Sequence, residues 1–518
     1  MRVAPLSVIR PACRCALVLG LAVLQSVSFS APGIPPIPAA PREYRAAWCA
    51  TVTNIDWPPK AGVSSTIVTQ QKNRLIAHLD AMEEARMNAM YLQVRPACDA
   101  MYNSTIEPPS QWLTGSQTTA ATWDPLAFAV TEAHKRGIEL HAWVNPYRAA
   151  LDQKTSNKSI KHVMRKSPEL CVSYSDGKTY MDPGKQGSIN WIVNVVSEIV
   201  TKYNVDGVVF DDYFYPGTDF DDAATYQAYR NSGGKMALDD WRRDNVNRLI
   251  QACYNKIHSI RSSCQFEVGP FGIWQPGYPK GVSGANYYAT HYCDTRLWLK
   301  NGWVDSLSPQ LYWPMDSPGQ PFGALIDWWV AQNPNRHVMA SMADYRVGGA
   351  DSFGNTWSDK TNQEIINQIN RVKTAGGVGT VHYSMKFITD NFKGKNDTIG
   401  LKTALMNGPY KEDALRPAST WLDNTPPPPP NISVSTPSGP NGAHTFTFSQ
   451  NPTDEKASWW CVYTYNGSRW NLKVVPGMLA SYTAPAPVMA FAVSAVDRNG
   501  NESARAGFAD VDDWTIYE

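Results

Sequence analysis

Eight short apolar runs recur between residues 45 and 383, and stretches with helical periodicity separate them. The runs cover residues 45–52, 89–95, 139–145, 207–211, 265–270, 306–312, 338–342 and 379–383. Helices are predicted over residues 69–87, 125–136, 189–203, 241–261 and 362–375. Strands that alternate with helices are typical of a parallel sheet. Eight of them predict an α/β fold, a closed (β/α)8 TIM barrel.

Proline-rich and turn-rich segments divide the rest of the chain. The run Pro426–Pro430 is the sharpest boundary, since consecutive prolines stiffen into an extended spacer. Beyond it, short β-rich runs alternate with turn clusters such as Asn466-Gly467, which predicts a small all-β sandwich. The expected units are a Pro-rich lead-in (31–42), the barrel (43–415), a Pro-rich linker (416–430) and the sandwich (431–518).

The first thirty residues have the features of a secretory signal peptide. Arg2, Arg10 and Arg14 precede an apolar run over residues 16–27, and small residues follow it. That run is short for a transmembrane helix, and no later stretch approaches roughly 20 apolar residues. We therefore expect a periplasmic or extracellular protein whose mature chain does not insert into a membrane.

The cysteines, the charge balance and the absence of certain sequence motifs limit the classes of partner and cofactor that we expect. The cysteines beyond residue 30 form no CxxC pair, and a disulfide between Cys253 and Cys264 or buried free thiols are the two alternatives. The 47 Lys and Arg balance 46 Asp and Glu without a basic block, so no nucleic acid partner is expected. There is no GxSxG, HExxH or P-loop, and no metal or other cofactor is expected.

The ends of the eight runs carry polar groups beside aromatic residues, and barrel enzymes place their chemistry at strand ends. Such a set suits a polyhydroxylated ligand, because hydroxyls need donors and acceptors and sugar rings stack on aromatic faces. The 19 Trp of the chain favour the same ligand class. The polar candidates for substrate binding are Arg95, Asp99, Asn145, Arg148, Asp182 and Gln310. The aromatic candidates are Trp57, Tyr213, Tyr215, Trp274, Tyr312 and Trp313. For the polar residues, hydrogen bonds within the barrel rim or a turn are the alternative.

Asp211 and Asp212 end the fourth run and are the central catalytic candidates. Side chains alternate along a strand, so we expect one carboxyl to face a sugar and the other to hold a neighbour. Asp211 is predicted as nucleophile or charge stabiliser, with Asp212 as acid/base or supporting group. Alternatively, the pair caps the following loop or anchors Arg148 or Arg95.

Hydrolysis of a glycosidic bond also needs a proton donor. Asp344, at the end of the seventh run, is a further catalytic candidate, because an apolar setting would raise its pKa as a general acid requires. Glu267 lies within the fifth run, and we interpret it as a buried ion-pair partner instead.

Several blocks resemble, in order over residues 43–415, the glycosyl-hydrolase-like family 10, a bacterial family of exported barrel proteins. They include EYRAAWCATVTNIDWPP, MNAMYLQVRPACDAMY, HAWVNPYR, YMDPG, YNVDGVVFDDYFYP, WRRDNVNRLI, VGPFGIW and VDSLSPQLYWP. The resemblance implies a glycoside hydrolase that acts on cell-wall glycan, similar to enzymes of the division site that cleave peptidoglycan strands stripped of their peptides.

The C-terminal stretch FAVSAVDRNGNESA resembles a fibronectin type III domain, which implies a spacer or a docking module for a protein or the cell wall. Two alternatives to the cell-wall hydrolase stay open. One is a noncatalytic carbohydrate-binding protein that uses the same cleft. The other is a hydrolase of a different polysaccharide such as an α-glucan.

Overall fold

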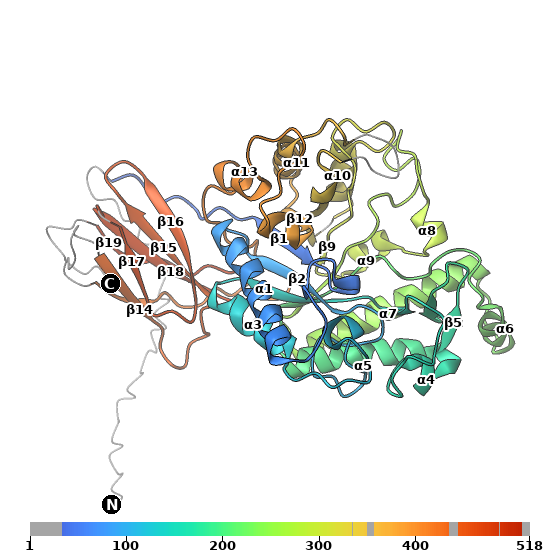
Figure 1. Ribbon diagram of the computed structural model, residues 1–518. Helices are drawn as coiled ribbons and strands as arrows, with labels where there is room; N and C mark the ends of the chain where they lie inside the picture. The colour runs from blue at the N-terminus through green and yellow to red at the C-terminus, as the bar shows by residue number, and fades with distance from the viewer. Residues whose placement is uncertain (1–33, 334, 350–356, 435–443, 486, 510–518) are drawn as a thin grey trace, which may run out of the picture.

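A computed structural model describes residues 34–333, 335–349, 357–434, 444–485 and 487–509. The predicted signal peptide, residues 1–30, therefore lies outside the described residues. Figure 1 shows a large α/β body with an all-β unit packed on one side of it. Among the described residues, every helix falls short of the length or apolarity that a bilayer crossing requires.

The large body is a parallel barrel. Its strands are β1 (Tyr44–Cys49), β2 (Ala89–Arg95), β3 (Glu139–Val144), β7 (Gly207–Phe210), β8 (Gln265–Val268), β9 (Ser306–Leu307), β10 (His337–Val338), β11 (Ala340–Ala343) and β12 (Gly379–Tyr383). They pair in the order β10-β9-β8-β7-β3-β2-β1-β12-β11. Because only Met339 separates β10 from β11, these two segments form one strand position and close the sheet. The (β/α)8 prediction is confirmed.

Helices cover the outside of the barrel. The long ones are α1 (Ser65–Glu84), α3 (Pro125–Lys135), α5 (Gln186–Lys202), α7 (Leu238–Ile260), α10 (Phe322–Ala331) and α11 (Asn362–Ala375). The shorter ones are α2 (Gln111–Thr114), α4 (Val163–Lys166), α6 (Ala223–Asn231), α8 (Tyr287–Thr290), α9 (Thr295–Asn301), α12 (Met385–Thr389) and α13 (Leu401–Asn407). Local signals set the ends of several. Asp124 caps α3, whose first residue is proline, and α11 stops at Gly376, where φ is 85°.

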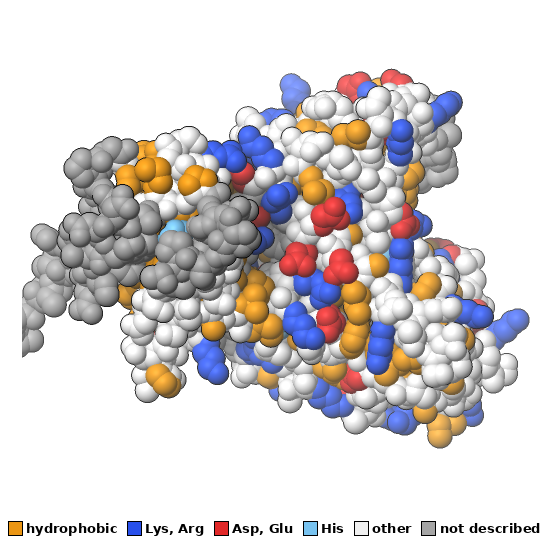
Figure 2. All heavy atoms as spheres, turned by 60° about the vertical axis from the view of Figure 1, so that its left-hand side comes forward, with side chains coloured by type: hydrophobic (Ala, Val, Ile, Leu, Met, Phe, Trp, Pro, Cys, Tyr) orange, Lys and Arg blue, Asp and Glu red, His pale blue; other side chains and the backbone are white. Residues whose placement is uncertain are grey.

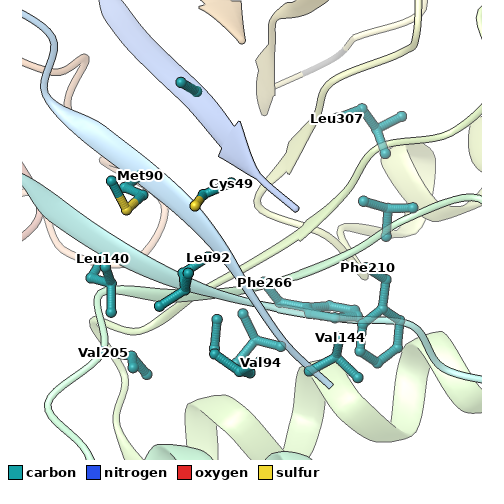
Figure 3. Close-up of a cluster of buried hydrophobic side chains, with 14 of the residues drawn as sticks. Cys49, Met90, Leu92, Val94, Leu140, Val144, Val205, Phe210, Phe266 and Leu307 are labelled. Carbon is teal, nitrogen blue, oxygen red and sulfur yellow. The ribbon is translucent and has the colours of Figure 1, made fainter. Parts of the chain in front are cut away.

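Two buried layers stabilise the barrel. The larger lies between strands and helices, where Met90, Leu92 and Val94 of β2 point outward with Phe266 of β8 (Figure 3). The smaller fills the inside and is aromatic, with the ring of Trp48 4.8 Å from those of Tyr91 and Trp143. Alternate residues of each strand supply the two layers.

An insertion follows β3 before the chain enters α5. It contains α4 and a small antiparallel sheet, in the order β4 (Arg148–Ala150), β6 (Thr179–Met181), β5 (Cys171–Ser173). Since it begins where β3 ends, it stands beside the mouth of the barrel.

The C-terminal unit consists of two antiparallel sheets. One has the order β13 (Asn431–Val434), β14 (His444–Ser449), β17 (Ser481–Ala484). The other has the order β16 (Trp470–Pro476), β15 (Trp459–Tyr465), β18 (Ala490–Val496), β19 (Ala506–Ala509). An apolar cluster that includes Phe446, Trp460 and Phe491 lies between them. The all-β prediction is confirmed.

The sandwich docks on the face of the barrel where the strands begin. Trp459 donates from Nε1 to the carbonyl of Gly137, just before β3, at 2.7 Å. Arg498 contacts Asp206, just before β7, at 2.9 Å. The segment from residue 416 is not a free spacer, since buried Arg416 pairs with Glu139 at 3.2 Å and Trp421 donates to Asp305 at 2.7 Å. Figure 2 shows the sandwich against the barrel, whose surface here mixes basic and acidic side chains.

The seven cysteines beyond residue 30 all lie in the described residues, and all are free thiols. Six are buried, and Cys171 is partly buried. Of the two alternatives that the sequence left open for Cys253 and Cys264, the structure therefore shows buried free thiols.

Candidate active site

Asp211 directly follows β7, and two side chains of the barrel anchor its carboxyl group at the mouth. Its Oδ2 accepts hydrogen bonds from Trp143 Nε1 at 3.1 Å and from the Asn145 amide. Asn145 is in turn held by Gln93, whose Nε2 donates to Asn145 Oδ1 at 2.5 Å. Asp211 Oδ1 is buried and has no hydrogen-bond partner among the described residues. The two oxygens of Asp211 therefore differ, since side chains hold Oδ2 but not Oδ1.

Asp212 lies beside it in a different electrostatic state. Burial and the charge of Asp211 hold the pKa of Asp212 well above its usual range, although a hydrogen bond with Gln310 opposes the shift. Burial also raises the pKa of Asp211, to about 6, against the lowering effect of Arg148. Because two neighbouring buried carboxyls resist double ionisation, the pair favours sharing one proton, and the pKa of Asp212 is shifted upward more strongly than that of Asp211.

Arg148, the first residue of β4, supplies the positive charge beside this pair. Its Nε donates to the carbonyl of Pro96 at 2.9 Å, and its guanidinium lies 5.0 Å from the ring centre of Tyr213. Its second terminal nitrogen is buried without a hydrogen-bond partner in the described chain. Tyr213 is 42% exposed and is therefore open to a ligand at the mouth.

Three tyrosines from neighbouring strand ends face one another across the mouth. The ring centres of Tyr312, Tyr345 and Tyr383 are 5.9 to 6.2 Å apart. Burial is the largest cause of the raised pKa values of Tyr312 and Tyr383. The charges of Asp212 and Asp211, respectively, raise them further, so both rings lie near the carboxyl pair. Together with Tyr213 they give the mouth an aromatic wall with hydroxyls at its edge.

Two of these residues, Tyr345 and Tyr383, are absent from the sequence-based candidates. Tyr287 of α8 is a third, since Asp212 also raises its pKa, after burial. Its ring stacks on Phe271, with centres 3.5 Å apart. The sequence does contain a signal for Tyr383. It follows His382 at the end of β12, and since neighbouring side chains of a strand point to opposite faces of the sheet, the two residues cannot face the same side of the barrel.

The structure places Asp344 away from the pair. Its carboxylate lies 3.0 Å from His382 Nδ1, and His382 Nε2 lies 3.1 Å from the Tyr410 hydroxyl. Tyr410 belongs to the layer between strands and helices, and it also contacts Thr380. Burial raises the pKa of Asp344, as expected, but the side chain is on the helix side of the wall. This position does not support Asp344 as the proton donor.

Three of the polar candidates for substrate binding are also turned inward. Arg95 is fully buried, where it forms an ion pair with Glu107 at 2.6 Å and donates to the carbonyls of Asn145 and Pro146. Asp99 accepts from Gln117 at 3.2 Å. Asp182 accepts from Thr225 at 2.5 Å and from the Gly184 amide at 2.9 Å. These side chains tie loops to the barrel and have no free face for a sugar.

Some of the aromatic candidates are also buried away from the carboxyl pair, whereas others lie near it. Trp57 is fully buried and donates to the carbonyl of Gln71, and Tyr215 is fully buried and accepts from Asn245. Trp274 and Trp313 are partly buried against the outer apolar layer. The structure brings only Tyr213 and Tyr312 to the carboxyl pair, together with Asn145, Arg148 and Gln310.

Glu267 lies inside the barrel in an ion pair. His141 Nδ1 is 2.6 Å from its carboxylate, and Tyr91 donates to it. Burial opposes the charged imidazole, but Glu267 and Glu139 raise the pKa of His141 to about 10. Glu267 is therefore a neutralised structural carboxylate, as interpreted from the sequence.

A closed parallel barrel with coupled carboxyls at a strand end, a neighbouring cation and a tyrosine wall has the parts of a glycoside hydrolase. The sequence profile described as "Glycosyl hydrolase-like 10" matches residues 43–359. The chain therefore belongs to the glycosyl hydrolase-like 10 family, and its enzymatic class is that of the glycoside hydrolases.

Two named relatives agree. The chain is 36% identical over 447 residues to "Glycosyl hydrolase YngK" of Bacillus subtilis, covering 83% of this chain and 84% of that one. It is 33% identical over 381 residues to "Glycosyl hydrolase DigH" of Escherichia coli, covering 68% of this chain and 86% of that one. Among solved structures, an α-L-fucosidase from Paenibacillus thiaminolyticus is similar over 71% of this chain and 49% of its own, with 9% identity and a TM-score of 0.45.

Proposed function

We propose that the protein is an exported enzyme that hydrolyses glycosidic bonds of cell-wall glycan, with peptide-free peptidoglycan strands as substrate. The proposed units are a signal peptide (1–30), a catalytic barrel (43–415) and a fibronectin type III-like sandwich (431–518). The three-stranded and four-stranded sheets of the C-terminal unit support the last of these. The family resemblance of the strand ends supports the substrate.

The observation that carries the catalytic assignment is the asymmetry of the carboxyl pair. Asp211 has one anchored oxygen and one buried oxygen that forms no hydrogen bond with any residue the structure describes, and it lies beside Asp212, whose pKa is strongly raised. In the proposed reaction, protonated Asp212 donates its proton to the leaving glycosidic oxygen. The Asp211 carboxylate stabilises the positive charge that develops on the sugar, or attacks it as nucleophile.

Arg148 and the tyrosines would bind the glycan around this centre. Arg148 offers a buried nitrogen without a protein partner, which suits the lactyl carboxylate of muramic acid. Tyr213, at 42% exposure, offers a face for a sugar ring.

The test compares the full chain with Asp211→Asn and Asp212→Asn on peptide-free glycan strands, intact peptidoglycan and soluble starch. Released reducing ends are counted and products identified by mass spectrometry. Each variant should lose activity by about 10²-fold or more, the usual contribution of a positioned acid or base. The melting temperature should not fall, because Asn removes the buried charge of Asp211, which burial disfavours, and is a neutral replacement for the protonated Asp212.

Asp221→Asn is the matched control, since Asp221 is exposed in the same loop. A fully active, folded Asp211→Asn variant would overturn the catalytic assignment. Products from starch alone would indicate an α-glucan hydrolase, and glycan binding without products would indicate a noncatalytic binding protein.

A further inference from the structure

A cavity of about 740 Å³ lies outside the proposed active site, and neither Asp211 nor Asp212 is among its lining residues. Its walls come from the loops on either side of α2, from residues 159–165 of the insertion after β3, and from the last residue of α5. In Figure 1, α4 and α5 lie near each other at the lower edge of the barrel. The volume is that of a site for a small ligand or a few sugar rings.

The lining of this cavity is basic and rich in hydrogen-bonding groups. Lys161, Arg165 and Lys202 line it, and no Asp or Glu is among its lining residues. Hydroxyl and amide side chains make up much of the remaining wall, including those of Asn103, Thr105, Gln117, Thr118, Thr119 and Ser159. A ligand that complements this set carries negative charge and many hydroxyls.

Two of the three cations are available to a ligand. Lys202 is paired with Glu198 at 2.7 Å. Lys161 and Arg165 are exposed, and neither forms an ion pair with a carboxylate within the described parts of the chain. Arg165 Nη1 donates to the carbonyl of Lys158 at 2.9 Å, which leaves its other terminal nitrogen for a ligand. The charge of the whole chain is only +1, so this local excess of positive charge is not a general property of its surface.

Buried hydrogen bonds fix the walls before any ligand binds. His162 is fully buried, and its Nε2 lies 3.2 Å from the carbonyl oxygen of Ala97 and 3.1 Å from that of Ala149. Gln117 is 4% exposed, donates to Asp99 at 3.2 Å and accepts from the Ser159 amide at 3.4 Å. A preformed wall reduces the ordering cost of binding. Ala149 follows Arg148 in β4, so the cavity and the proposed active site share one insertion.

We propose that this cavity is a second saccharide site, which binds a carboxylate-bearing segment of the glycan strand while another segment occupies the mouth. The identity of the polymer rests on the proposed function, but the recognised chemistry is that of an acidic oligosaccharide. A glycan strand long enough to reach both sites binds at two places at once. The protein should therefore bind long strands with a higher apparent affinity than short ones.

The test measures binding without turnover. Two proteins are compared: Asp211→Asn alone, and Asp211→Asn combined with the cavity variant Lys161→Ala/Arg165→Ala. Their affinities are measured for peptide-free strands and for a soluble muramic acid-containing oligosaccharide. The combined variant should bind both at least about tenfold more weakly, because it removes two cations and a single charge-assisted contact already corresponds to about tenfold in affinity. On glycan whose carboxyl groups have been reduced, the two proteins should bind equally.

Lys154→Ala/Arg230→Ala is the control, since both side chains are exposed and neither lines the cavity. When Asp211 is kept, the Lys161→Ala/Arg165→Ala variant should hydrolyse a short soluble substrate at the wild-type rate. It should hydrolyse long strands more slowly than the wild type. Equal binding by the cavity variant and the control, or no saturable binding of the acidic oligosaccharide, overturns the proposal. Absence of hydrolysis by the wild type would overturn the proposed function alone, because the binding comparison needs no turnover.

Discussion

The carboxyl groups of this barrel differ in what surrounds each oxygen. The carboxylate of Glu267 is ion-paired with His141 and that of Asp182 accepts two hydrogen bonds, whereas Asp211 Oδ1 forms neither an ion pair nor a hydrogen bond within the described residues. A buried polar atom without a partner costs stability, so its retention at a strand end is typical of a position that binds a ligand. Asp211 thus differs from the other two carboxyls by one buried oxygen that forms no hydrogen bond or ion pair with a described residue.

The pH dependence of activity follows from the pair. We expect kcat/KM to rise with pH as Asp211 ionises, around its pKa of about 6, and to fall at higher pH as Asp212 loses its proton. Arg148 lowers the pKa of Asp211, so Arg148→Ala should move the acidic limb to higher pH. Rate profiles measured from pH 4 to 9 would check this. Arg148→Lys, which keeps the charge, should leave the limb nearer its wild-type position, and an unmoved limb in Arg148→Ala would contradict the assignment.

At the level of elements, buried ion pairs and hydrogen bonds hold the loops at the strand ends in place. Arg95 ends β2 and holds Glu107 and the chain after β3 with its guanidinium. Removing one partner of a buried ion pair leaves the other charge without compensation. Arg95→Leu should therefore lower the free energy of unfolding by about 3–5 kcal/mol in denaturant titrations.

Arg74→Ala provides the comparison. Arg74 pairs with Asp390 at 2.9 Å, but the two side chains are 27% and 57% exposed. Exposed ion pairs contribute about 0–1 kcal/mol, so this variant should be nearly as stable as the wild type. A loss in Arg95→Leu no larger than in Arg74→Ala would show that the anchor is dispensable.

The sequence predicted the eight strand positions because apolar runs of five to eight residues that alternate with helices are too short to form buried helices and fit buried strands. It did not indicate the interruption of the seventh strand at Met339, nor α10, whose apolar residues are not confined to one stripe. Within the candidate site, the pattern located strand ends but not side-chain directions. The register of β2 shifts between Gln93 and Arg95, and Asp344 lies beyond the end of β11, so simple alternation could not place either side chain.

At the scale of the whole molecule, the sandwich and the barrel share buried polar contacts. Arg498 donates to Asp206 and to the carbonyls of Asn204 and Val205, and Asp206 also accepts from the Leu140 amide. Arg498→Ala should lower stability by about 2 kcal/mol, as expected for lost hydrogen bonds to a charged group. It should also broaden or split the thermal transition in calorimetry. Arg469→Ala, an exposed arginine in a turn of the sandwich, should leave the transition unchanged.

The docking of the sandwich on the face where the strands begin also fixes an orientation. A surface or bead that captured the molecule through its C-terminal sheets would hold it by the side opposite the mouth, with Tyr213 and the carboxyl pair facing the solution. Immobilised in this way, the protein should keep access to polymeric substrate, whereas coupling through the insertion after β3 would press the mouth against the support.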